Sequence, residues 1–314
     1  MTEPNDWERK TLEKLALSAL QEQRRARNWG IFFKMLGFIY LFLLLFLISG
    51  WLGKSEPSLT GKHTALVELH GVIGPDGEAS ADNIIGALQD AFQDKGTRAV
   101  VLRINSPGGS PVQAGQIYDE IRRLRGKYPN IPLYVVVDDI CASGGYYVAA
   151  AADRIYVDKA SLVGSIGVLM DGFGFTGSME KLGVERRLIT AGENKGFLDP
   201  FSPENPAQKH YAQSMVEEIH RQFIQAVRTG RGKRLHETPD MFSGLVWTGE
   251  KSVQLGLADG YGSLDSVARD VVQAEDIVDY TPHEGIADRL AKRFGAEVGK
   301  AVLPGSRFGA TGMR

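Results

Sequence analysis

One apolar segment near the N-terminus constrains this chain most. Residues 31–52 are almost wholly apolar: Lys34 is their only charge, and residues 35–52 form 18 consecutive uncharged positions. A run of that length spans the hydrocarbon core of a bilayer as a helix. A buried core helix would keep a polar face, and a cleaved signal peptide would be shorter and lie closer to the N-terminus. We therefore expect a transmembrane helix at residues 31–52.

The charges beside this segment predict its orientation. Arg24, Arg25 and Arg27 precede it, whereas Lys54 and Lys62 are the nearest positive residues after it. Because positive residues are enriched on the cytoplasmic side, the N-terminus should be cytoplasmic. We expect a single-pass protein of the inner (cytoplasmic) membrane whose globular part is periplasmic or otherwise extracytoplasmic.

Composition and patterning divide the chain into five parts. Residues 1–30 read as a polar cytoplasmic extension, 31–52 as the anchor and 53–63 as a Pro/Ser/Gly-containing linker. Residues 64–275 form the globular domain. Residues 276–314 form a tail with one expected amphipathic helix, whose apolar positions are Ile286, Leu290, Phe294 and Val298.

The globular domain alternates between strand-like and helix-like segments. Strands are predicted at residues 64–69, 98–104, 133–137, 154–157, 166–170 and 184–190, and helices at 84–92, from Pro111 onward, 205–229 and 264–272. This order is typical of an α/β fold with parallel strands covered by helices. A net charge of -2 gives no support for nucleic-acid binding.

One turn stands out chemically. Ser143 follows a predicted strand and precedes Gly144, Gly145 and a small-residue helix, so its hydroxyl would lie at the helix N-terminus. That position suits a nucleophile, and equally a serine that merely caps the helix. Cys141 is a rival nucleophile or a small buried hydrophobe, and as the only cysteine it excludes an intrachain disulfide and a cysteine-based zinc site.

A serine nucleophile needs a base. None of the six histidines lies in a recognisable catalytic motif. Lys195, between Gly192 and Gly196 and close to apolar residues, would serve if its site were dry enough to keep the amine neutral, in which case activity should rise toward alkaline pH. A solvated loop lysine is the alternative, and the pattern alone does not favour Lys195 over Lys159 or Lys181.

Several short motifs, taken in order, resemble peptidase family S49, the signal peptide peptidases of the SppA/SohB type. They run between about Thr64 and Val272: Arg103–Gly109, Ala142–Tyr147, Val163–Val168, Ala191–Lys195 with Asp199–Phe201, and Val246–Gly249 with Leu255–Asp259. The resemblance implies that Ser143 is the nucleophile, Lys195 the general base, and Ser165 the residue that orients the lysine. It also implies that the N–H groups of Gly109 and Gly144 bind the oxyanion. Without it, Ser165 and Gly109 read as turn residues.

The same resemblance implies a crotonase/ClpP-like spiral fold and a serine endopeptidase that needs no cofactor or metal. It also implies a homo-oligomer, such as an octameric ring, whose catalytic groups meet across subunit boundaries. A hydrophobic groove would take extended peptides, such as signal-peptide remnants left in the membrane.

Three other functions compete with that of a peptidase. Residues 172–177 match GxGxxG, but they lie deep in the domain and carry bulky Phe173 and Phe175, which argues against a dinucleotide loop. An acyl-CoA enzyme of crotonase-like fold would not need a Ser-Gly-Gly turn and a lysine loop. The third alternative is an inactive, membrane-bound oligomeric scaffold. Replacing Ser143 would distinguish a peptidase from such a scaffold.

Overall fold

The computed structural model describes residues 6–48 and 61–282, which belong to two separate units. The first holds α1 (Asp6–Ile48), a continuous helix of 43 residues that joins the expected polar extension to the apolar segment. Within it, residues 20–44 are long and apolar enough to cross a membrane. Residues 49–52 of the expected anchor and the expected tail helix lie outside the described residues. The finding fits a membrane-anchored protein.

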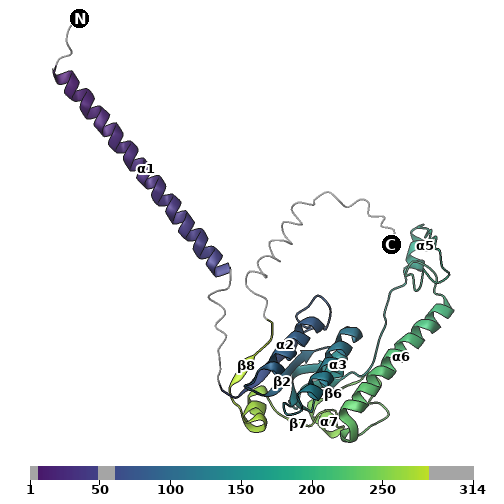
Figure 1. The fold of residues 1–314 in the computed structure, drawn as a ribbon. Coiled ribbons are helices and arrows are strands. Elements are labelled where there is room, and N and C mark those ends of the chain that lie inside the picture. Colours follow the sequence, from purple (N-terminus) through teal and green to yellow (C-terminus); the bar gives the residue numbers. More distant parts are fainter. Residues whose placement is uncertain (1–5, 49–60, 283–314) are drawn as a thin grey trace. The chain divides into compact units, whose positions relative to one another are not determined.

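The second unit is built on one mostly parallel sheet (Figure 1). Its strands are β1 (His63–His70), β2 (Thr97–Ser106), β3 (Leu133–Ala142), β4 (Arg154–Val157), β5 (Leu162–Gly164), β6 (Val246–Thr248), β7 (Gly260–Tyr261) and β8 (Ile277–Asp279). The main order is β6-β5-β3-β2-β1-β8, and the β5–β6 pair alone among the described pairs is antiparallel. This confirms the expected α/β fold of the crotonase/ClpP-like type.

Strand β3 changes partner along its length, and this positions the site. Residues 134–136 pair with β4, whereas residues 140–142 pair with β5. The strand therefore ends beside Gly164, and the chain turns at once into the short helix α4 (Gly144–Ala149). Ser143 is the residue at that turn.

Helices cover the sheet through apolar faces that the sequence predicts. Helices α2 (Ala81–Gln93) and α3 (Pro111–Lys127) pack their buried residues against β1 to β3. Their N-termini are capped by the side chains of Ser80 and Ser110. On the other side of the sheet, Val101, Val136 and Tyr156 pack with Val267, which begins the helical turn that follows α8 (Leu264–Ser266).

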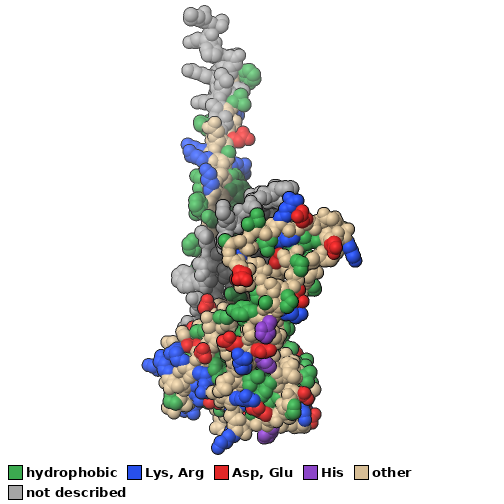
Figure 2. Space-filling view, turned by 90° about the vertical axis from the view of Figure 1, so that its right-hand side faces the viewer, with side chains coloured by type: hydrophobic (Ala, Val, Ile, Leu, Met, Phe, Trp, Pro, Cys, Tyr) green, Lys and Arg blue, Asp and Glu red, His purple; other side chains and the backbone are tan. Residues whose placement is uncertain are grey.

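Between residues 169 and 205 the chain leaves the sheet as an exposed arm, carrying the short helix α5 (Thr176–Lys181), and returns to start α6 (Pro206–Arg231). Figure 1 shows α5 at the end of α6 that is distant from the sheet. Large apolar side chains of the arm are exposed, and Figure 2 shows hydrophobic side chains at the surface of this unit among charged ones.

Two predicted strands are wrong. Residues 166–170 and 184–190 have β-type sequences but pair with no strand in the described chain. A strand needs a neighbouring backbone to bond to, and both segments run where the described chain supplies none. Strand β8 pairs with β1 and lies beyond residue 275, the predicted end of the domain.

Candidate active site

Ser143 adopts a backbone conformation that is unusual for a residue with a side chain. Its φ is 52° and its ψ is -123°, and its hydroxyl makes no capping bond to α4. The conformation is fixed from both sides: the Ser143 N–H donates to the Gly164 carbonyl at 2.8 Å, and the Tyr147 N–H donates to the Ser143 carbonyl at 2.9 Å. Strained backbone of this kind costs about 1–3 kcal/mol and persists where the surroundings impose it. The hydroxyl is therefore presented to the pocket rather than used to cap the helix.

The two predicted oxyanion glycines lie side by side next to this serine. A Cβ placed on Gly144 would lie 3.3 Å from the Gly109 nitrogen, and one placed on Gly108 would lie 2.7 Å from the Gly144 nitrogen. The loop is fastened by Ile73, whose N–H donates to the Gly108 carbonyl and whose carbonyl accepts from Ser110. Within the described chain, neither the Gly109 N–H nor the Gly144 N–H has an acceptor. The arrangement offers two adjacent free donors for a developing negative charge.

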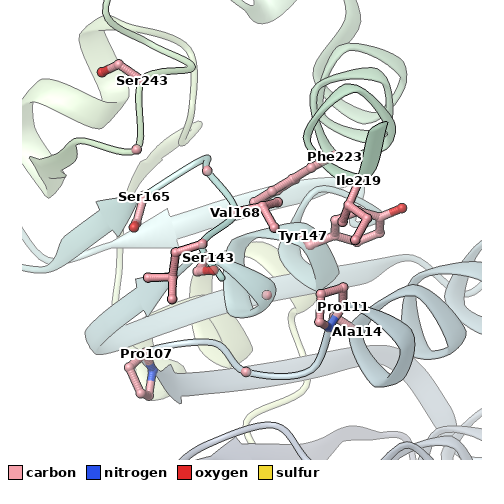
Figure 3. Close-up of a pocket in the computed structure, with 15 residues that line it drawn as sticks. Pro107, Pro111, Ala114, Ser143, Tyr147, Ser165, Val168, Ile219, Phe223 and Ser243 are labelled. Carbon is pink, nitrogen blue, oxygen red and sulfur yellow. The ribbon is translucent and has the colours of Figure 1, made fainter. Parts of the chain in front are cut away.

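These groups open into a pocket of about 590 Å³ (Figure 3). Figure 3 shows Ser143 and Ser165 toward one end, with Tyr147, Ile219 and Phe223 toward the other. The Tyr147 and Phe223 rings pack with their centroids 5.0 Å apart. One end of the pocket thus carries the serine hydroxyls, and the other is lined by aromatic and aliphatic side chains.

Ser165 also holds an unusual backbone conformation, with a φ of 49°. Its N–H donates to the Leu245 carbonyl at 2.8 Å, and it follows Gly164, which already accepts from Ser143. Four of the five predicted site residues, Ser143, Ser165, Gly109 and Gly144, therefore line one pocket.

Lys195 is the residue that the structure does not bring to this pocket. It is exposed in the arm, and among the described residues no lysine, histidine or carboxylate lines the pocket. Phe197, two residues later, packs on Tyr211 with ring centroids 5.8 Å apart. Tyr211 precedes the pocket residue Phe223 by 12 positions on α6, a rise of about 18 Å along the helix axis. One copy of the described chain presents the serine without the lysine.

Cys141 is excluded as the rival nucleophile. It is fully buried in the core, and burial raises the pKa of its thiol far above the ordinary value. A thiol that stays protonated and out of reach of solvent does not attack a substrate. The alternative of a small buried hydrophobe is correct.

The apolar wall supplied by α6 was not recognised from the sequence as part of the site. Ile219 and Phe223 belong to a stripe at helical spacing, which core packing would explain equally well. Ser243 and Gly244 also line the pocket, and neither was predicted as a site residue. Whether these residues reach the pocket depends on how α6 and this loop pack. Local sequence patterns do not predict that packing.

Comparison with known proteins places the chain among peptidases. The family model described as Peptidase family S49 matches residues 126–277. The chain is 45% identical over 209 residues to a Brucella melitensis biotype 1 protein named Na(+)/H(+) antiporter NhaA, covering 65% of this chain and 28% of that protein. It is 28% identical to a putative signal peptide peptidase SppA of Enterococcus faecium, covering 68% of this chain and 65% of that protein.

A putative protease of Synechocystis sp. is 30% identical over 204 residues, which cover 65% of this chain and 71% of that protein. By contrast, the chain spans only 28% of the Brucella protein and 65% of the Enterococcus protein. What those whole proteins do is therefore not transferred with the matched segment. The residues that the family model matches include Ser143 and Ser165, whereas Gly109 precedes them.

Proposed function

This chain belongs to peptidase family S49, and we propose that it is a membrane-anchored serine endopeptidase that hydrolyses apolar peptides with a Ser–Lys dyad. One observation carries the proposal. The strained Ser143 lies in a pocket beside the N–H groups of Gly109 and Gly144, which have no acceptor among the described residues. A nucleophilic oxygen next to a pair of free donors is the arrangement that acyl transfer requires.

The reaction follows from these groups. The Ser143 oxygen attacks the peptide carbonyl carbon while a base takes its proton, and the Gly109 and Gly144 N–H groups stabilise the oxyanion. Collapse of the tetrahedral intermediate expels the amine, which takes up that proton, and leaves an acyl-enzyme. Water activated by the same base then releases the acid and restores the Ser143 hydroxyl.

We assign the base to Lys195 of a neighbouring copy of the chain. The support is that the described pocket residues include no base, while Lys195 is exposed on an arm that extends away from its own pocket. Ser165, which lines the pocket, would accept a hydrogen bond from the incoming amine and orient it. The enzyme would then be a homo-oligomer, such as an octamer, with each site completed by a neighbouring subunit.

The substrate is proposed to be an extended apolar peptide, such as a signal-peptide remnant in the inner membrane. Gly167, Val168 and Leu169 line the pocket, and in the described chain their backbone groups make no hydrogen bonds. A peptide could pair with this free edge by strand addition while its side chain enters the apolar end of the pocket. An anchor in α1 would keep the site close to a membrane-embedded substrate, on the periplasmic side.

The test is the full-length protein with Ser143→Ala, assayed on a fluorogenic apolar peptide in detergent. Activity and labelling by a serine-directed phosphonate should both disappear, while the melting temperature and the assembly size stay unchanged. Ser214→Ala is the matched control, because that exposed serine donates, within the described chain, to the Tyr211 carbonyl of its own helix. Proteolysis that survives Ser143→Ala would refute the assignment, and a wild-type protein with neither activity nor labelling would favour the inactive scaffold.

A further inference from the structure

A histidine outside the pocket fastens the segment that carries Ser165. His220 lies on α6, half-buried, and its Nε2 is 3.1 Å from the Ile166 carbonyl oxygen. Since a carbonyl only accepts, the ring nitrogen is the donor. Ile166 follows Ser165 directly, and its side chain is fully buried.

This bond is singular among the contacts of its segment. In the described chain it is the only hydrogen bond from a side chain to residues 164–170; the bonds from Ser143 to Gly164 and from Ser165 to Leu245 join backbone atoms. The φ of 49° at Ser165 must be imposed from outside, because a serine relaxes to negative φ when it is free to do so. The Leu245 carbonyl holds the residue from one side and His220 holds the next peptide from the other.

His220 also links this segment to the apolar wall. Its neighbours on the same helix, Ile219 and Phe223, line the pocket, as do Gly167 and Val168 just beyond the bonded carbonyl. The hydrogen bond thus joins the helix that supplies the wall to the segment that carries Ser165 and the free backbone edge.

We infer that His220 is a positioning residue for peptide hydrolysis: it fixes Ser165 and the edge at residues 167–169 through the Ile166 carbonyl. The inference rests on the proposed function, since its kinetic consequence requires a working Ser143. His220 itself contacts neither the substrate nor the reacting atoms. Its loss should let Ser165 relax and move both the hydroxyl that orients the base and the edge that binds the peptide.

Two variants of the full-length protein distinguish the effect of losing the hydrogen bond from the effect of losing the imidazole ring. His220→Gln keeps a donor nitrogen at the same distance along the side chain, and His220→Phe keeps a ring without a donor. We expect kcat/KM to fall about ten-fold or more in His220→Phe, through kcat as well as KM, and to recover to within about three-fold of wild type in His220→Gln. His210→Gln, at an exposed position of α6, is the matched control and should behave as wild type.

Hydrogen–deuterium exchange gives a readout that does not depend on activity. The bonded amides of Ser143 and Ser165 should exchange faster in His220→Phe than in wild type or His220→Gln, with unchanged melting temperature and assembly size. If His220→Phe matches wild type in both measurements, or if His220→Gln falls as far as His220→Phe, the inference is wrong. Should His220→Phe fail to fold, His220→Leu replaces it under the same criteria. A wild type inactive on every peptide would instead count against the proposed function, and the exchange data would still decide the role of His220.

Discussion

Subunits carrying Ser143→Ala, mixed with subunits carrying Lys195→Ala, should regain activity that neither variant has alone. Each variant lacks one half of the proposed dyad and keeps the other. If a site takes its serine from one copy and its lysine from the next, a mixed assembly contains complete sites. If the serine and the lysine of a site came from the same copy, no mixture of the two variants could contain a complete site.

The structure sets the size of the effect. Proton transfer needs the two groups within about 3 Å. In one chain, the ring contact that fixes the lysine arm lies 12 residues along α6 from Phe223, a separation of about 18 Å. In the described chain the arm therefore does not bring Lys195 to its own pocket, and a site within one copy would require the arm to move. In a randomly mixed closed ring, a site is complete when an intact Ser143 faces an intact Lys195, which at equal proportions holds for about one quarter of sites.

The assay is hydrolysis of a fluorogenic apolar peptide after co-expression, or after dissociation and reassembly, over a series of subunit ratios. Recovered activity should follow the product of the two subunit fractions, with its maximum at equal proportions. The matched control mixes wild type with Ser143→Ala, where activity should instead fall linearly with the variant fraction. Zero recovery at every ratio, in assemblies shown by mass spectrometry to be mixed, would refute a dyad shared between subunits.

Three further outcomes follow from the described residues. Gly144→Ala would place a methyl group 3.3 Å from the Gly109 nitrogen, so kcat should fall about 100- to 1,000-fold while the melting temperature stays near that of wild type. Burial alone would raise the pKa of Asp259, but its bonds to the buried Arg231 hold that pKa below the ordinary value. The free energy of unfolding in urea should therefore be largest above about pH 4 and decrease as the pH falls further, and this decrease should be smaller in Asp259→Asn. Cys141 should resist alkylation by a neutral maleimide in the folded protein and react once urea unfolds it.

Local patterns predicted the parts of the site that local structure builds. The strand before Ser143 and the glycines after it mark a sharp turn, and the structure places the turn there. The same reasoning failed for residues 184–190, where β-type side chains predict an extended chain but no partner strand follows from them. Lys195 was singled out through the family motifs, because a lysine between glycines has the same local signature whether it is a base or a solvated side chain.

The arm that carries Lys195 also exposes large apolar side chains. A neighbouring copy of the chain would account both for this exposure and for the base that the described pocket lacks. Ile189 is 95% exposed, Leu182 78% and Phe173 76%, because nothing in the described chain covers them. Apolar groups gathered at a surface favour burial against another molecule, at about 25 cal/mol for each Å² removed from water. A neighbouring copy would cover the arm and receive its lysine in one contact. Assembly and catalysis would then be one equilibrium, so dilution that dissociates the oligomer should abolish proteolysis while each subunit stays folded.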